Sequence, residues 1–322
     1  MTGARAATRA GATPETGSGA VWPWAPAATR PPDPAPDPGG SRVEVVDPAD
    51  LTRVGARPPL GRYTAALWGR RSFLWHEARA RVTSGVRETL LGQAWLIVRP
   101  VLDGLAYFVV FGLLLDVRRG VPNFIGYLVV GTFLFAFTSQ SVTSAGRSIH
   151  ASRNVIRAFA FPRASVPFSV VLQGVLGLAP SMVAMLGLLL VLPERASWTW
   201  HALLFPVVLT LQVVFVTGTC LVVARLGAML PDVNQLIAVL LRFWFYGSGV
   251  FFSFEQLDLP PTLLTVVHAN PMFLVLDAAR DCLLYGRAPA GGTWLLLGAW
   301  SVGVLLVGYV FFWRGEETYG RG

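Results

Sequence analysis

Six stretches of about 20 mainly apolar residues constrain the fold of this chain more than any other feature. They lie at about 95–115, 123–145, 166–192, 202–226, 234–254 and 293–313. A helix needs about 20 such residues to cross the hydrocarbon core of a membrane. In lipid the backbone polar groups must be bonded internally, which a helix does within one segment. The sequence therefore predicts an all-α integral, multi-pass protein of the cell membrane with six transmembrane helices.

The arginines of the short loops predict the orientation of these spans. Six spans place both termini on one side, and thirteen arginines flank the spans there, at positions 70, 71, 79, 81, 87, 147, 153, 157, 163, 225, 242, 314 and 321. The other side has five, at positions 118, 119, 195, 280 and 287. Because cytoplasmic loops carry the excess of positive charge, both termini are predicted to be cytoplasmic.

Composition divides the chain into three parts. Residues 1–60 hold 11 of the 23 prolines, and few large apolar residues, which predicts a disordered Pro-rich cytoplasmic tail, either passive or tethering. Residues 61–90 form an amphipathic segment and residues 91–322 the six-span membrane domain. The tail is net neutral, so the whole net charge of +8 lies in residues 61–322 among apolar stretches, which favours a membrane over a nucleic acid as the partner.

Residues 63–82 carry an apolar arc when they are drawn as a helix. The arc holds Leu67, Trp68, Leu74, Trp75, Ala78 and Val82, and most charged residues fall outside it. A tryptophan-bearing apolar face opposite an arginine-bearing polar face predicts a helix lying in the plane of the membrane surface and leading into the first span. An amphipathic helix of a soluble domain is disfavoured, because no soluble domain remains to pack it.

The segment between the fifth and sixth spans contains two apolar pieces, 262–269 and 272–285, each too short to cross a membrane. Polar breaks at Asn270-Pro271 and Arg280-Asp281 divide them. Two short re-entrant helices dipping in from the outer side account for both facts, because irregular backbone at membrane depth needs shielding by protein or a water cavity. Two helices lying flat on the outer surface are the alternative.

The loop between the second and third spans predicts a short cytoplasmic helix over 148–160. Ile149, Ile156 and Phe159 fall on one face, while Asn154 and Arg157 fall on others, and Pro162 ends the pattern. Such an apolar knob suits docking into the groove of a soluble partner. A solvated basic loop held by anionic headgroups is the alternative.

Two groups of side chains within the spans are candidates for contact with cargo. Arg99 and Asp103 stand at i and i+4 in the first span, where ionisable groups are costly and point to function. The fifth span carries the aromatic run of residues 243–246 together with Phe251 and Phe252. The first pair could equally be an interfacial ion pair, and the aromatic residues could equally be packing or an interfacial belt.

Several kinds of chemistry are excluded by absent residues. All 26 basic residues are arginine, so the chain has neither a Schiff-base lysine nor a P-loop, which needs a lysine on the phosphates. Cys220 and Cys282 form no CxxC pair and the four histidines are scattered, so neither a disulfide framework nor a metal site is predicted. The chain is not predicted to be an enzyme, and any ATP must be bound by another chain.

The order of several short motifs resembles a known family. The motifs are Arg79-Ala80-Arg81, Leu91-Gly92, Trp95, Pro100, Phe111-Gly112, Tyr127-Leu128, Gly131, Asn154, Ile156, Phe161-Pro162, Asn270-Pro271-Met272, Arg280-Asp281 and Gly286. They cover about 63–313 and resemble the membrane subunit of type-two ABC exporters, in the branch that exports lipid-linked polysaccharides such as O-antigen, teichoic acid, capsule or galactan. The chain departs from the family at Leu230-Pro231-Asp232, where an Arg-Asp pair is common, so only Asp232 carries over.

The resemblance implies a homodimeric permease powered by two copies of a separate nucleotide-binding subunit, which would bind ATP and Mg. Coupling to that subunit would involve Ile149, Arg153, Asn154, Ile156, Arg157, Phe159 and Asp232. The substrate channel or gate would involve Trp95, Arg99, Asp103, Phe243, Trp244, Phe245, Tyr246, Phe251 and Phe252, and the re-entrant segment Asn270, Pro271 and Arg280. An ABC exporter of a drug or small lipid, or a secondary transporter, is the alternative. A polyprenyl-linked transferase is disfavoured, because Asp103 is essentially the only acid within the spans.

Overall fold

The computed structural model describes residues 58–87, 94, 98, 101–102, 105–106, 109–110, 123–158, 161–191, 197–230, 232–254, 257 and 260–319. The chain forms two units, Met1–Arg53 and Val54–Gly322, and all described residues belong to the second. Its elements are α1 (Leu60–Gly69), α2 (Arg71–Arg87), α4 (Phe124–Ala151), α5 (Arg153–Ala158), α6 (Ser165–Val191), η2 (Trp200–Leu204), α7 (Phe205–Met229), α8 (Val233–Gly247), α9 (Pro261–His268), α10 (Pro271–Leu283) and α11 (Gly291–Arg314). The all-α prediction is confirmed for this part of the chain.

Four helical segments are long and apolar enough to cross a membrane. They are Phe124–Ala151, Ser165–Val191, Trp200–Met229 and Gly291–Arg314. They coincide with the predicted second, third, fourth and sixth spans, so the prediction of a multi-pass protein is confirmed. The predicted first span, 95–115, lies mostly outside the described residues.

The predicted fifth span is shorter than the sequence suggests. Hydropathy extends it over 234–254, whereas the helix α8 ends at Gly247 after 15 residues. At 1.5 Å per residue α8 is about 22 Å long, against about 30 Å for the hydrocarbon core. The chain turns at Gly249, which adopts a φ of 66° in the left-handed region that glycine tolerates best. The apolar residues that follow Gly249 therefore belong to an irregular segment.

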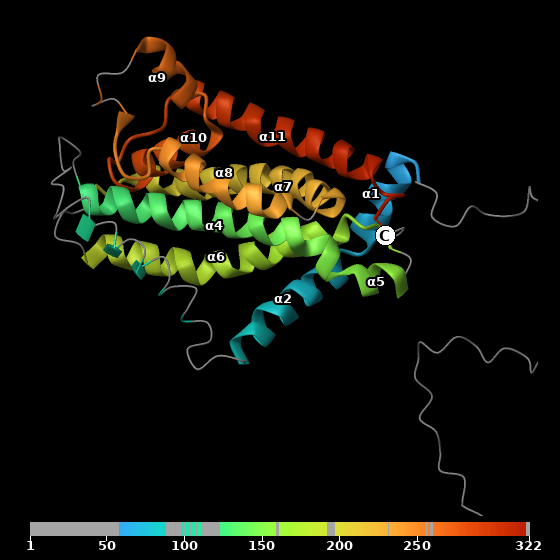
Figure 1. The fold of residues 1–322 in the computed structure, drawn as a ribbon. Helices are drawn as coiled ribbons and strands as arrows, with labels where there is room; N and C mark the ends of the chain where they lie inside the picture. The colour runs from blue at the N-terminus through green and yellow to red at the C-terminus, as the bar shows by residue number, and fades with distance from the viewer. Residues whose placement is uncertain are drawn as a thin grey trace, which may run out of the picture. The chain divides into compact units, whose positions relative to one another are not determined.

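The four long helices pack side by side (Figure 1). The helix α7 contacts both α4 and α11, and α6 packs on α4. Gly218 of α7 and Gly308 of α11 meet where these helices cross, and a Cβ on Gly218 would lie 2.5 Å from the backbone of Val304. Small residues at such crossings let membrane helices approach closely. The core therefore lies around α4 and α7, which are the most buried of the four.

The predicted in-plane helix is two helices in the structure. The helix α1 ends at Gly69, where helix propensity is low, and α2 begins at Arg71. Leu74 and Ala78 of α2 are buried and α2 packs on α6, while Trp68 stays exposed. Figure 1 shows α2 running obliquely to α6. The location of these helices at a membrane surface stays a prediction.

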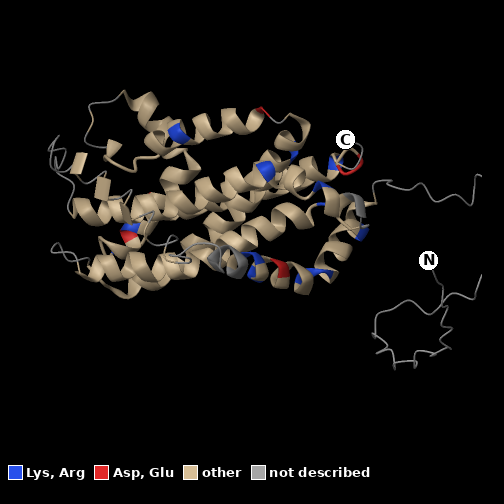
Figure 2. Ribbon diagram, turned by 60° about the horizontal axis from the view of Figure 1, so that its bottom comes forward, with Lys and Arg blue, Asp and Glu red and all other residues tan. Residues whose placement is uncertain are grey.

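Most of the charged residues lie toward one end of the helices, near the C-terminal end of α11 (Figure 2). We call this the charged end: α4, α7 and α11 finish there, and α6 begins there. A cluster of buried, mainly apolar residues lies at this end. It consists of Tyr63, Ile149, Ile156, Ala164, Val166, Leu221, Ala224, Phe312 and Tyr319. The assignment of this end to the cytoplasm stays a prediction.

Candidate functional site

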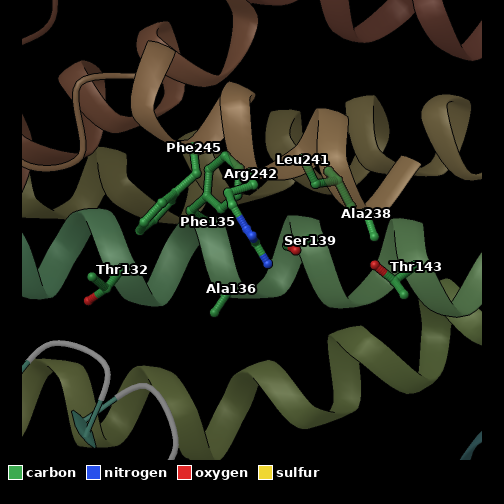
Figure 3. A pocket seen from close by; sticks show the side chains of 9 residues that line it. All are labelled: Thr132, Phe135, Ala136, Ser139, Thr143, Ala238, Leu241, Arg242 and Phe245. Atoms are coloured by element: carbon green, nitrogen blue, oxygen red, sulfur yellow. The ribbon is translucent and has the colours of Figure 1, made fainter. Parts of the chain in front are cut away.

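A groove with a partly polar lining separates α4 from α8 (Figure 3). Its volume is about 270 Å³. Thr132, Phe135, Ala136, Ser139 and Thr143 line it from α4, and Ala238, Leu241, Arg242 and Phe245 line it from α8. The guanidinium of Arg242 points across the groove toward α4, close to Ser139 (Figure 3).

The spacing of small residues on α4 creates this groove. Thr132, Ala136, Ser139 and Thr143 follow one another at intervals of four and three, so they share one face of the helix. Their side chains are too short to fill the space opposite α8. Larger side chains close part of its length, since the rings of Phe135 and Phe245 meet at a centroid distance of 4.8 Å.

The groove lies near the middle of α4. At 1.5 Å per residue Ser139 is about 22 Å from the first residue of α4 and about 18 Å from the last. The prediction that Arg242 flanks a cytoplasmic loop is wrong. Because α8 begins at Val233, directly after the turn at Asp232, Arg242 is ten residues into the helix and faces the middle of α4.

A positive charge at this depth is costly unless it is paired. Among the described residues ion pairs join Arg81 to Glu77 and Arg287 to Asp281, so no described acid neutralises Arg242. The side chain of Arg242 is exposed in the groove. The groove therefore offers a cation to whatever enters it.

The aromatic residues of α8 and the segment after it divide into two groups. Phe243 and Tyr246 are exposed to 70% and 44%, so they are available to lipid or cargo. Phe251 is fully buried and packs against Phe245 with ring centroids 4.9 Å apart. Phe252 and Trp244 are half-buried. A role in lining a passage stays a prediction, and in this structure Phe251 serves packing instead.

The break predicted at Asn270-Pro271 is confirmed, since α9 and α10 meet there at a bend of 79°. Asn270 caps α10 by accepting a hydrogen bond from the N–H of Met272 at 3.0 Å, and its amide donates to the carbonyl of Gly247 at 3.0 Å. Trp244 donates to the same Asn270 side chain at 2.9 Å. Asn270 thus fastens the start of α10 to the end of α8.

The bent pair α9 and α10 is either a broken span or a re-entrant loop, so the prediction of re-entrant helices stays a prediction. The first turn of α10 is deep, because Met272 lies 3.6 Å from the hydroxyl of Thr138 near the middle of α4. Its last turn lies beside η2, where Ser197 donates to the carbonyl of Leu284 at 3.0 Å. The helix is almost wholly buried, which disfavours a position flat on the outer surface.

The second predicted break is wrong, because Arg280 and Asp281 lie inside α10. Arg280 is 2% exposed and donates to the carbonyls of Gly249 at 3.0 Å, Tyr127 at 3.2 Å and Val250 at 3.3 Å. Its guanidinium also lies 3.2 Å from the ring centroid of Tyr127. A buried charge is tolerated when it is paired or hydrogen-bonded, and three carbonyls accept from the two terminal nitrogens of Arg280, while its Nε has no partner among the described residues. These bonds also hold the irregular segment that ends α8.

The predicted coupling segment is shorter than expected and its isoleucines face inward. The helix α4 extends to Ala151, and α5 covers only Arg153–Ala158. Ile149 and Ile156 are 3% and 5% exposed and pack in the apolar cluster of the charged end, so neither forms an exposed knob. The exposed face of α5 instead consists of Arg153, Asn154 and Val155.

Of the remaining predicted site residues, the structure describes the side chain of Asp232 but not those of the other five. Asp232 is exposed in the turn before α8. Arg157 is in α5, but its side chain is outside the described part, as are Phe159, Trp95, Arg99 and Asp103.

A group of buried hydrogen bonds centred on Glu316 is not predicted from the sequence. The carboxylate of Glu316 accepts from the hydroxyl of Tyr63 at 2.7 Å and from the N–H of Arg163 at 2.9 Å. The N–H of Ala164 donates to the Tyr63 hydroxyl at 3.0 Å. Burial raises the pKa of both Glu316 and Tyr63. No sequence signal links Tyr63 to Glu316, because they are 253 positions apart.

Comparison with known proteins gives a consistent result. The ABC-2 type transporter family model matches residues 75–284, more than half of the chain. The chain is 26% identical over 249 residues to an O-antigen export system permease protein RfbA of Myxococcus xanthus, covering 77% of this chain and 92% of that protein. Two RfbA proteins of Klebsiella pneumoniae are 24% and 23% identical over 203 and 202 residues, covering 62% of this chain and 75% of theirs. The chain is a multi-pass membrane protein that belongs to the ABC-2 type transporter family.

Proposed function

We propose that this chain is the membrane permease subunit of an ABC exporter that moves a lipid-linked polysaccharide out of the cytoplasm. The observation that carries the proposal is the similarity to an O-antigen export permease over 92% of that protein. The family match over residues 75–284 includes the bent pair α9 and α10.

The described helices supply a surface suited to such cargo. Phe243 and Tyr246 present aromatic rings along the exposed side of α8, and sugar rings stack on aromatic faces through their C–H groups. Arg242 and the hydroxyls of α4 add hydrogen-bond donors beside these rings. A surface that combines stacking with few specific bonds is compatible with a repeating glycan.

Energy would come from a separate subunit that binds ATP and Mg, because this chain contains no lysine for a P-loop. Two copies of the chain would pair in the membrane. The exposed face of α5, with Arg153, Asn154 and Val155, would contact the ATP-binding subunit at the charged end. ATP binding would shift the helices between inward and outward states by contacting α5 differently in each.

Purification tests the assembly. We expect the tagged chain, extracted in mild detergent, to co-purify with a protein carrying a GxxxxGK[ST] motif at one copy per copy of this chain. Depletion of the chain in cells should leave the lipid-linked glycan on the cytoplasmic face. Purification without such an ATPase, or normal surface glycan after depletion, would refute the proposal.

A matched pair of variants tests coupling through α5. Val155→Asp places a carboxylate on the exposed face of α5, whereas Ala288→Asp places one on an exposed loop at the opposite end. We expect Val155→Asp to lower glycan export at least tenfold and to abolish stimulation of ATP hydrolysis, with Ala288→Asp unchanged. Equal export by the two variants would remove α5 from the coupling surface.

A further inference from the structure

We propose that the groove between α4 and α8 is an intermediate binding site for the phosphate group of a lipid, with Arg242 as its principal donor. The proposal rests on the proposed function and deepens it, since it names the part of the cargo that the groove holds. A phosphate carried by a lipid must pass the middle of the membrane during export, which is the depth that Arg242 faces.

The polar side of the groove combines one cationic donor with hydroxyls that can donate or accept. The guanidinium of Arg242 donates and cannot accept. The hydroxyl of Thr132, which also lines the groove, bonds back to the carbonyl of Leu128 in its own helix at 2.8 Å. The hydroxyls of Ser139 and Thr143 make no hydrogen bond to another described residue, and both line the groove. A site that offers one cation and two hydroxyls selects an anionic acceptor.

Phosphate matches this donor set better than other anions of the membrane. A guanidinium presents its N–H groups as a planar fork that binds two phosphate oxygens at once, which leaves further oxygens for hydroxyl donors. The volume of about 270 Å³ lies just below the range of about 300–1,000 Å³ for sites of drug-sized ligands. The groove can therefore hold a headgroup but not a whole glycan.

The apolar chain of the same lipid has a surface beside the groove. Leu236, Val239, Leu240 and Phe243 of α8 are all exposed by at least half of their surface. These side chains and Arg242 belong to one helix, so a lipid with its phosphate in the groove can lay its hydrocarbon along α8. The ligand class is thus a phosphorylated lipid rather than free phosphate.

Native mass spectrometry of the purified chain in detergent tests the proposal, with undecaprenyl phosphate, uncharged undecaprenol and phosphatidylglycerol as probes. We expect undecaprenyl phosphate to bind at least about tenfold more tightly than undecaprenol, as expected when hydrogen bonds to a charged group are gained. Arg242→Gln should abolish this preference, and Arg242→Lys should retain part of it. The matched control Arg62→Gln removes an exposed arginine of α1 and should keep the preference.

Three outcomes would overturn the proposal. The first is an unchanged preference in a folded Arg242→Gln protein, and the second is an equal loss in Arg62→Gln. The third is equal binding of phosphatidylglycerol, with displacement of undecaprenyl phosphate, which would assign the groove to bulk phospholipid. Free inorganic phosphate should not compete at millimolar concentration, because it lacks the hydrocarbon contact.

The failure of this inference is distinguishable from the failure of the proposed function. Co-purification of an ATPase with unchanged lipid binding by Arg242→Gln would retain the exporter and reject the site. A binding preference that depends on Arg242, without any ATPase partner, would retain the site and reject the exporter.

Discussion

Replacement of Glu316 by alanine should destabilise the charged end, although Glu316 lies beyond the last helix. Its carboxylate accepts hydrogen bonds from the Tyr63 hydroxyl at 2.7 Å and from the N–H of Arg163 at 2.9 Å. Tyr63 is 1% exposed, so water cannot replace the lost acceptor. The bonds join α1, the segment before α6 and the residues after α11, so their loss weakens the contacts among all three.

The magnitude follows from the two donors that remain. Each buried donor left without an acceptor costs about 1–3 kcal/mol, so the loss of two acceptors in Glu316→Ala should cost about 2–6 kcal/mol. Tyr63→Phe removes one donor to Glu316 and the acceptor of the Ala164 N–H, and it should cost about 1–3 kcal/mol. Glu316→Gln keeps an acceptor and should fall between Glu316→Ala and the wild type.

Thermal unfolding in detergent, followed by intrinsic fluorescence, measures these effects. For proteins of about 150–250 residues 1 kcal/mol corresponds to a shift of about 2–4 °C, so Glu316→Ala should unfold at least about 4 °C below the wild type. The control Glu77→Ala breaks an exposed ion pair of α2 and should shift the transition by less than about 2 °C. Equal transitions for Glu316→Ala and Glu77→Ala would refute the reasoning.

Two further predictions use the same assay. Arg280→Gln should cost about 2–4 kcal/mol, because the carbonyls of Gly249 and Val250 lose a charged donor. The control Arg62→Gln removes an exposed arginine of α1 and should cost less than about 1 kcal/mol, and equal costs would contradict the role of Arg280. Burial raises the pKa of Glu316 above the value of about 4.3 in an unfolded chain, so the folded protein holds the proton of this carboxyl group more tightly than the unfolded chain does. The stability that protonation of Glu316 adds is fully present below about pH 4.3 and is lost as the pH rises through the folded-state pKa. The Glu316→Gln protein should lack this part of the pH dependence, and an unchanged profile would contradict it.

Local signals in the sequence predict several elements well. Apolar runs of sufficient length indicate α4, α6, α7 and α11, since length and hydropathy are properties of one segment. The junction of α9 and α10 is equally local, because Asn270 is a good N-cap and Pro271 suits the first position of a helix. Features of this kind need no knowledge of distant residues.

Other features depend on neighbours that the sequence does not identify. The apolar stretch of the fifth span continues through Phe251 and Phe252, so hydropathy predicts that the span ends after them. In the structure α8 ends at Gly247. Ile156 has the spacing of an exposed knob but is covered by residues such as Tyr63, which is 93 positions away. Apolar residues at an exposed docking face and at a buried face have the same pattern, and only the tertiary contacts separate them.

The two arginines of α8 and α10 show why an ionisable residue among apolar helices does not by itself mark a functional site. Arg280 donates to three backbone carbonyls and is buried, so its charge is used within the fold. Arg242 faces a cavity, and no described acid is paired with it, so its charge is available to a ligand. Replacing Arg280 should therefore change stability first, whereas replacing Arg242 should change binding first. An ionisable residue among membrane helices is expected to be functional when its charge has no partner within the fold, and Arg242 meets this condition among the described residues. Arg280 does not meet it, because backbone carbonyls use its charge.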